Sequence, residues 1–350
     1  MYPFAEGMNF PYNQWYVVAW SSEIGRELLP RTVLSTPLVL YRTLDGQAVA
    51  IDNRCPHRRF PLSKGRLQGD AIQCGYHGFT FDSSGKCTVV PSQDRVPMNY
   101  GARSFPLVER WDWVWIWMGD PSLADESRIP DHRPLHVLDD GWLPVVGGHE
   151  LIEARYVFLH DNLLDLTHVS FLHGDTIGSP GVSATEAQIE QYPDRIEISR
   201  FIKSDKVDHL PLAKAMSMTG LADRDMVQQF FPPGLHCTGS DFRSAQDGGV
   251  SPGKHFGGFR VMHGITPETE TTTHYFWAFC RNFGPQDEVL TERMKGVIGS
   301  ALQQDKVGVA ACEEMVRMGS LGAEIHAKAD AAGLRGRKAI EHQIEAETVR

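Results

Sequence analysis

The sequence reads Cys55-Pro56-His57 in one place and Cys74-Gly75-Tyr76-His77 a little further on, and these two stretches decide the fold of the first third of the chain. Each supplies one thiol and one imidazole. Two thiolates and two imidazoles together hold a [2Fe–2S] cluster in which cysteines bind one iron and histidines bind the other. The pair of motifs therefore predicts one-electron transfer, and the chain must also provide an acceptor for the electron.

Two other interpretations of these four residues stay open. A structural zinc ion also takes two cysteines and two histidines, but zinc fingers usually keep the two cysteines together and the two histidines together. Alternatively, the four residues are unconnected members of a core. One ligand of each kind in each loop favours the mixed-ligand cluster, which is the Rieske type.

Length and composition limit the class of protein. A chain of 350 residues predicts two domains, and a proline-punctuated segment after Gly119 places the boundary near residue 140, giving domains 1–140 and 141–350. The formal charge of −10 argues against nucleic acid as a partner. The sequence has no apolar run of membrane-spanning length, no signal peptide and no paired spacing among its other four cysteines. We therefore expect a cytoplasmic protein with reduced thiols and no membrane partner.

The first third of the chain has the pattern of short β-strands. Residues 15–20, 38–41 and 48–51 are rich in β-branched and aromatic residues, and Asp45-Gly46 is a hairpin-turn signal. In the segment 111–118 tryptophan occupies every second position, so that a strand would place all four indoles on one face. An aromatic electron path is one interpretation of this segment. Core packing is favoured, because tryptophan is used mainly for its large buried area.

A second group of candidate ligands lies just beyond the expected boundary. Mononuclear iron(II) oxygenases hold their metal with two imidazoles and one carboxylate and leave positions open for O₂ and substrate. His168 and His173 are the candidate imidazoles. Their separation of five residues puts them about 140° apart on a regular helix, so binding by both requires the helix to end or bulge between them. Asn162 and Asp165 precede His168 at three-residue intervals and share its face. The alternative is that the histidines only pack or cap a helix end.

A predicted helix over about 291–318 offers the third ligand. Its apolar positions Ile298, Leu302, Val309, Cys312 and Val316 recur at helical spacing. Asp305 falls on the same stripe, and a buried carboxylate needs a cation or hydrogen bonds. Asp305 is therefore the predicted third iron ligand, with pairing to a buried arginine or lysine as the alternative.

Taken together, these motifs resemble the oxygenase component of Rieske non-heme iron oxygenases. The likeness is to the branch with a single type of subunit, which includes dicamba and vanillate O-demethylases and toluenesulfonate methyl-monooxygenase. The resemblance covers nearly the whole chain and extends to residues 13–17, 265–270, 281–283 and 304–306. It implies an α+β protein, with an all-β Rieske domain followed by a helix-grip domain in which a curved antiparallel sheet wraps a long C-terminal helix. It also implies a homotrimer.

The resemblance implies roles for several residues. Asp165 would bridge a cluster histidine of one subunit to His168 of the next, and Asn162 would lie beside the iron without binding it. His236 and His263 would contact an anionic aromatic substrate, with Phe276 and Trp277 also lining the pocket. The expected reaction uses O₂ to hydroxylate a methyl or methoxy carbon, and ring cis-dihydroxylation is the alternative. Because no G-x-G-x-x-G motif follows a strand, electrons from NAD(P)H should arrive through a separate reductase, with or without a ferredoxin. A Rieske ferredoxin, a pure electron carrier, would lack the second domain.

Overall fold

The structure is a computed structural model that describes residues 3–4, 9–131, 139–174, 176–213, 215–245, 253–319 and 322–348. The chain divides into two compact units. The loop unit comprises Phe10–Ile129 with Thr266–Glu270, and the sheet unit comprises Met1–Asn9, Pro130–Ile265 and Thr271–Arg350. The proline-punctuated segment expected before residue 140 lies partly in 132–138, outside the described residues. The domain boundary at residue 140 stays a prediction.

The loop unit consists of three small antiparallel sheets. The first contains β1 (Trp15–Trp20), β10 (Trp113–Trp117) and β9 (Leu107–Arg110), in that order. The second contains β2 (Leu29–Val33), β3 (Thr36–Arg42) and β4 (Ala48–Asp52). The third contains β5 (Arg66–Gln68), β6 (Ala71–Gln73), β7 (Thr80–Phe81) and β8 (Cys87–Val89). The cysteine of each predicted motif belongs to the same buried core as residues of β3, β4 and β6.

The strands predicted over 15–20, 38–41 and 48–51 are confirmed. The tryptophan-rich strand is shorter than expected. It begins at Trp113, because Trp111 and Asp112 adopt left-handed backbone angles (φ 59° and 62°) and form the preceding turn. Trp113, Trp115 and Trp117 are buried, which confirms core packing as their role.

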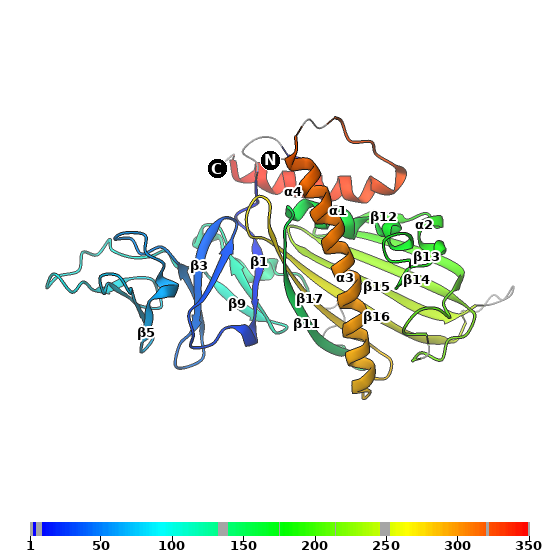
Figure 1. Cartoon of the computed structure of the whole chain (residues 1–350), viewed down its shortest axis with the longest axis horizontal. Helices are drawn as coiled ribbons and strands as arrows, with labels where there is room; N and C mark the ends of the chain where they lie inside the picture. The colour runs from blue at the N-terminus through cyan, green and yellow to red at the C-terminus, as the bar shows by residue number, and fades with distance from the viewer. Residues whose placement is uncertain are drawn as a thin grey trace. The chain divides into compact units, whose positions relative to one another are not determined.

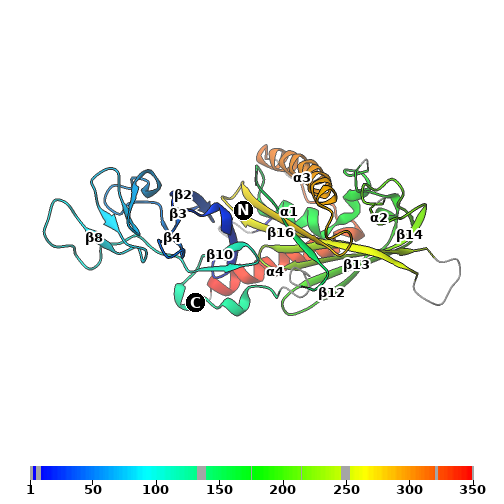
Figure 2. The same ribbon diagram turned by 90° about the horizontal axis from the view of Figure 1, so that it is seen from below.

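The sheet unit is built on seven strands in the order β11-β17-β16-β15-β14-β13-β12. Strands β12 (Gln188–Gln191) to β16 (His255–Pro267) pair antiparallel with their neighbours in sequence, and β11 (Leu143–Ile152) pairs antiparallel with β17 (Thr273–Arg281). The remaining strands are β13 (Ile196–Lys206), β14 (Leu221–Phe231) and β15 (Leu235–Ser244). In both views the long helix α3 (Glu288–Arg317) lies across one face of this sheet (Figures 1 and 2).

Among its described residues the sheet unit has three further α-helices: α1 (Tyr156–Leu164), α2 (Pro180–Ala184) and α4 (Ala331–Thr348). Helix α1 contacts both α3 and α4. The predicted α+β fold, with small sheets first and then an antiparallel sheet with a long C-terminal helix, is confirmed. In the described part of the chain, no helix is both long enough and apolar enough to cross a membrane.

Candidate metal centres and substrate cavity

The two motif loops of the loop unit have the same backbone shape. The first follows β4, and the second joins β6 to β7. In each, the cysteine N–H donates to the carbonyl five residues on, and the N–H four residues on donates to the cysteine carbonyl, at 2.8 to 3.1 Å. The equivalent residues Arg59 and Gly78 both have positive φ, at 62° and 74°. The chain therefore presents two ligand pairs on matching loops.

Within each loop the thiol points inward and the imidazole outward. Cys55 and Cys74 are each 2% exposed, whereas His57 and His77 are exposed and their ring centroids lie 4.6 Å apart. Burial raises the pKa of the Cys55 thiol to about 11, so a thiolate there needs a cation. The separation into a buried thiol pair and an exposed imidazole pair fits a two-iron cluster with mixed ligands.

A single zinc ion fits these four residues less well. A tetrahedral ion holds its ligand atoms within about 4 Å of one another, given metal–ligand distances near 2.0–2.3 Å. In the described part of the chain, one group of three or more candidate ligands has all its ligand atoms within 4.8 Å, and that group is His168, His173 and Asp305. The four motif residues do not form such a compact group, which fits two metal atoms better than one.

The chain leaves the α-helical path between Asp165 and His173, as the five-residue spacing requires. Helix α1 ends at Leu164, and Asp165 has extended backbone angles (φ −122°, ψ 94°). A short 3-10 helix, η6 (Leu166–Ser170), follows, and the Asp165 carboxylate accepts a hydrogen bond from the N–H of Thr167 as its N-cap. This break allows both imidazoles to turn toward one point.

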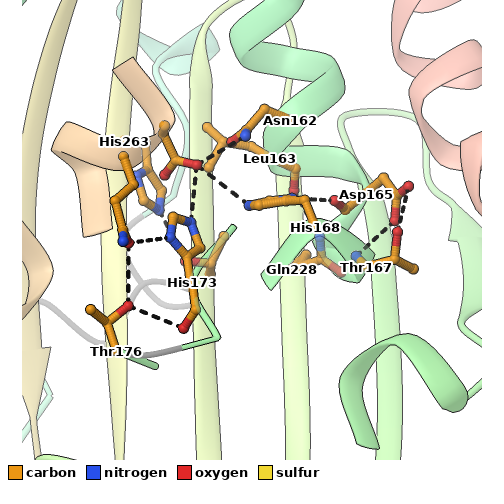
Figure 3. Close-up of polar contacts among 12 residues, drawn as sticks. Asn162, Leu163, Asp165, Thr167, His168, His173, Thr176, Gln228 and His263 are labelled. Carbon is orange, nitrogen blue, oxygen red and sulfur yellow. Dashed lines mark hydrogen bonds and ion pairs between the residues drawn. The ribbon is translucent and has the colours of Figure 1, made fainter. Parts of the chain in front are cut away.

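That point is the carboxylate of Asp305 on α3. Figure 3 shows the two labelled imidazoles, His168 and His173, turned toward each other. Oδ1 of Asp305 lies 3.0 Å from Nε2 of His173 and 3.5 Å from Nε2 of His168. Asp305 is 5% exposed and His173 is 1% exposed. Although burial opposes it, contact with the two imidazoles lowers the pKa of Asp305 and keeps it charged. The structure thus brings together the three residues predicted as iron ligands, while their role as ligands stays a prediction.

The other nitrogen of each imidazole is held by an oxygen acceptor. His168 Nδ1 donates to the main-chain carbonyl of Asp165 at 2.6 Å, and His173 Nδ1 donates to Oε1 of Gln304 at 2.8 Å. With the proton on Nδ1, the Nε2 atom of each imidazole has a lone pair when the ring is neutral, and both Nε2 atoms face the Asp305 carboxylate. Lone pairs and a carboxylate converge stably only around a cation or added protons, so the donor set fits a bound metal ion such as Fe²⁺.

Two predicted neighbours of the iron also lie here. Asn162 on α1 donates from Nδ2 to Oδ1 of Asp305 at 3.0 Å. The Asp165 carboxylate accepts from Oγ1 of Thr167 at 2.9 Å and lies 3.9 Å from the Arg200 guanidinium. It is therefore the Asp165 backbone, and not its carboxylate, that contacts His168 within one chain. The predicted carboxylate bridge to a second subunit remains a prediction.

A cavity of about 1070 Å³ of empty space, partly open to solvent, adjoins the candidate iron site. It lies between the sheet and α3, and its walls are mostly aliphatic and aromatic. The polar groups that line it are Asn162, His168, His173, Thr238, Ser240, His263, Asp305, Arg224 and Arg293. An apolar cavity with few polar groups is typical of a site for a small organic molecule.

Of the four predicted substrate contacts, the structure brings one, His263, to this cavity. Its Nδ1 lies 2.6 Å from the Tyr275 hydroxyl and its Nε2 lies 2.9 Å from Oγ1 of Thr238. His236 instead forms a hydrogen bond between its Nε2 and Nδ1 of His160 on α1, at 2.8 Å, and does not line the cavity. Burial lowers the pKa of His263 to about 3, so the imidazole is neutral.

The placement of Phe276 and Trp277 corrects the prediction that they line the pocket. Alternation along β17 puts Phe276 on the face opposite Tyr275, where it stacks on His149 of β11 at 4.3 Å. Trp277 lies against two glycines of β11: a side chain at Gly147 would overlap the indole, and a Cβ at Gly148 would lie 3.0 Å from its Nε1. A Cβ at Gly299 of α3 would lie 3.9 Å from the same indole. Trp277 therefore separates the sheet from α3.

The buried stripe of α3 also differs from the predicted one after Val309. Cys312 is exposed, and the next buried residue is Glu313, because a helix returns to the same face after four residues at this point. Glu313 is paired with Arg155, the residue before α1, at 2.6 Å between Oε2 and Nε. Both side chains are at most 6% exposed. The sequence analysis did not identify roles for Gln304, Glu313 and Arg224. The burial of Glu313 could have been predicted, because it lies four residues after Val309 and so falls on the same face of the helix.

Comparison with known proteins agrees with this geometry. Residues 14–106 match the Rieske [2Fe-2S] domain, and residues 152–346 match the vanillate O-demethylase oxygenase C-terminal domain. The toluene-4-sulfonate monooxygenase system iron-sulfur subunit of Comamonas testosteroni is 36% identical over 97% of this chain and 98% of its own. Dicamba O-demethylase oxygenase component of Stenotrophomonas maltophilia is 34% identical over 87% and 89%. The crystal structure of dicamba monooxygenase bound to 3,6-dichlorosalicylic acid superposes with a TM-score of 0.86, at 32% identity, over 98% of this chain and 100% of that one.

Proposed function

The chain belongs to the Rieske oxygenases of the vanillate O-demethylase type, and on that premise we propose that it hydroxylates a methoxy or methyl carbon of an aromatic acid. It is a Rieske non-heme iron monooxygenase with a [2Fe–2S] cluster and a mononuclear iron. The observation that carries the proposed reaction is the convergence of His168, His173 and Asp305 beside an apolar cavity.

The residues around the two centres have distinct tasks in this proposal. When bound, the cluster supplies single electrons and the mononuclear Fe²⁺ supplies the chemistry that activates O₂. Gln304 and the Asp165 carbonyl fix the tautomer and orientation of the two imidazoles. Asn162 holds the Asp305 carboxylate in place without binding metal. The aliphatic lining of the cavity excludes water and orients the ring.

Electron delivery involves partners outside this chain. We propose that a separate NAD(P)H-dependent reductase, directly or through a ferredoxin, reduces the cluster. The relatives named as oxygenase components or iron-sulfur subunits of multi-protein systems support this division of labour. A cluster in residues 1–140 would pass its electron to the iron of a neighbouring subunit in a homotrimer, through the Asp165 carboxylate. A cytoplasmic location is part of the proposal and is supported by the four cysteines outside the two motifs, none of which forms a disulfide.

The substrate class is proposed from the relatives and the cavity together. Two relatives are named for the demethylation of vanillate and dicamba, and another for toluene-4-sulfonate. Each of those substrates is an aromatic acid with a methoxy or methyl group, and the cavity of this chain is large enough for one substituted ring.

A panel of methoxylated and methylated benzoates and benzenesulfonates tests the proposal. The complete system, with a reductase, O₂ and NADH, should consume O₂ and release formaldehyde from a methoxylated substrate in equal amounts. A methylated substrate should give the benzyl alcohol. Formation of a ring cis-diol from these compounds would replace the proposal with the dioxygenase alternative.

A further inference from the structure

The substrate cavity contains one buried cation that the roles described above do not use. Arg224 on β14 lines the cavity and is 4% exposed. Its Nε donates to Oγ of Ser240 at 3.0 Å, and its guanidinium carbon lies 5.4 Å from the centre of the Phe242 ring. Its Nη1 is buried and has no hydrogen-bond partner among the described residues. A buried guanidinium with an unused donor is costly unless something else completes its contacts.

The nearest acid does not complete them. Asp205 Oδ2 lies 3.7 Å from Nη1 of Arg224, beyond hydrogen-bond distance, and accepts a hydrogen bond from Oγ of Ser179 at 2.9 Å. Asp205 therefore forms an ion pair with Arg224 and offsets part of the buried charge, but it does not complete a hydrogen bond to Nη1. The second cation of the cavity, Arg293 on α3, is exposed, so water already solvates it.

His263 is a poor alternative anchor for an anion. Both of its ring nitrogens are engaged, one by Tyr275 and the other by Thr238. A ring with both nitrogens occupied offers no N–H to a ligand, and it sits beside His173 at the candidate iron site (Figure 3). An acidic substrate thus needs its positive partner elsewhere in the cavity.

The register of β15 places the contacts of His263 and of Arg224 on one face of the strand. Thr238, which contacts His263, and Ser240, which contacts Arg224, point to the same face of β15 two residues apart. Two residues along an antiparallel strand rise about 7 Å, comparable to the span of a benzene ring with substituents at opposite positions.

We propose that Arg224 and Ser240 bind the carboxylate or sulfonate of the substrate and thereby turn its opposite substituent toward the candidate iron site. This assignment rests on the proposed function, and it adds the residue that selects anionic substrates. An oxyanion between Nη1 of Arg224 and the Ser240 hydroxyl would satisfy the unused donor with a charge-assisted hydrogen bond.

Binding measurements test the assignment without relying on turnover. We would titrate the full-length protein calorimetrically with 4-methoxybenzoate, toluene-4-sulfonate and the uncharged 4-methoxybenzamide. In Arg224→Met the Kd for both anions should rise about 10- to 100-fold, because a charge-assisted hydrogen bond is lost, while the Kd for the amide changes less than about threefold. Arg224→Lys should restore part of the anion affinity.

Two further variants serve as controls. Arg243→Met removes a β15 arginine that does not line the cavity and should leave all three affinities unchanged. Because Arg224→Met leaves the buried Asp205 without its cation, the double variant Arg224→Met/Asp205→Asn keeps the test valid if the single variant misfolds. The visible spectrum of the cluster and the iron content report on folding.

Several results would overturn the assignment: equal loss of amide and anion affinity, no change for any ligand, a full anion defect in Arg293→Met, or no anion binding to the unaltered protein. Arg224-dependent anion binding without formaldehyde or benzyl alcohol would support the anion site and contradict the proposed reaction.

Discussion

The hydrogen bond between Gln304 and His173 makes the sharpest test of the iron site. In Gln304→Leu the Nδ1 of His173 loses its acceptor at 2.8 Å, and the imidazole is free to rotate or change tautomer. Loss of such an outer partner of a metal ligand lowers metal affinity about 10- to 100-fold. This corresponds to about 1.4–2.8 kcal/mol. Competition with a chromogenic ferrous chelator would measure the affinity, and excess Fe²⁺ should restore much of the turnover.

Neighbouring variants make this test specific. Gln303→Leu alters the adjacent, exposed residue of the same helix and should bind iron like the unaltered protein. Gln304→Glu retains an oxygen acceptor for Nδ1 and should keep the iron. The visible spectrum of the cluster should be the same in all three variants. If Gln304→Leu and Gln303→Leu hold iron equally well, Gln304 does not orient His173 in the metal-bound protein.

Three further changes test other parts of the structure. Asp305→Ala removes the carboxylate of the three-residue site, so the mononuclear iron and turnover should be lost while the cluster spectrum persists; metal analysis that still finds both irons would move the third ligand elsewhere. Asp165→Asn keeps the carbonyl contact to His168, so both metals should load and the cluster should reduce, but product formation should fall by orders of magnitude; normal turnover would limit Asp165 to capping η6. Glu313→Leu removes the buried carboxylate that pairs with the Arg155 guanidinium and should destabilise the protein by about 3–5 kcal/mol, measured as a lower urea midpoint. Arg155→Leu/Glu313→Leu should recover most of that loss, and a double variant as unstable as the single one would argue against the ion pair as its cause.

The parts of the site that follow from local spacing could be predicted. Each matching loop carries its two ligands within a few residues, so a short motif such as Cys55 and His57 is enough to predict a cluster site. The five-residue interval between His168 and His173 required the helix to end between them, and α1 does end at Leu164. Asp305 was identifiable because a carboxylate on a buried stripe needs a cation or hydrogen bonds.

The contacts that could not be predicted depend on which face of a strand or helix each residue occupies in the folded protein. The alternation of β17 decides that Tyr275, and not Phe276, faces His263, and a single-residue shift would exchange them. The apolar stripe of α3 drifts by one position per few turns, so that Glu313 replaces Cys312 on the buried face. Glu313 pairs locally with Arg317, one helical turn on, but its buried partner is Arg155, 158 residues away, which no local pattern indicates.

The indole of Trp277 has a mechanical consequence for the catalytic chamber. It lies between the glycine pair of β11 and Gly299, so it is one of the groups that hold α3 off the sheet. Asp305 is carried by the same helix, less than two turns beyond Gly299. Trp277 therefore acts as a spacer: a thinner side chain at this position would let α3 move toward the sheet and shrink the chamber. Chamber height and carboxylate position are thus coupled through α3, so a change of size at Trp277 should alter the space for a bound molecule and the position of Asp305 together.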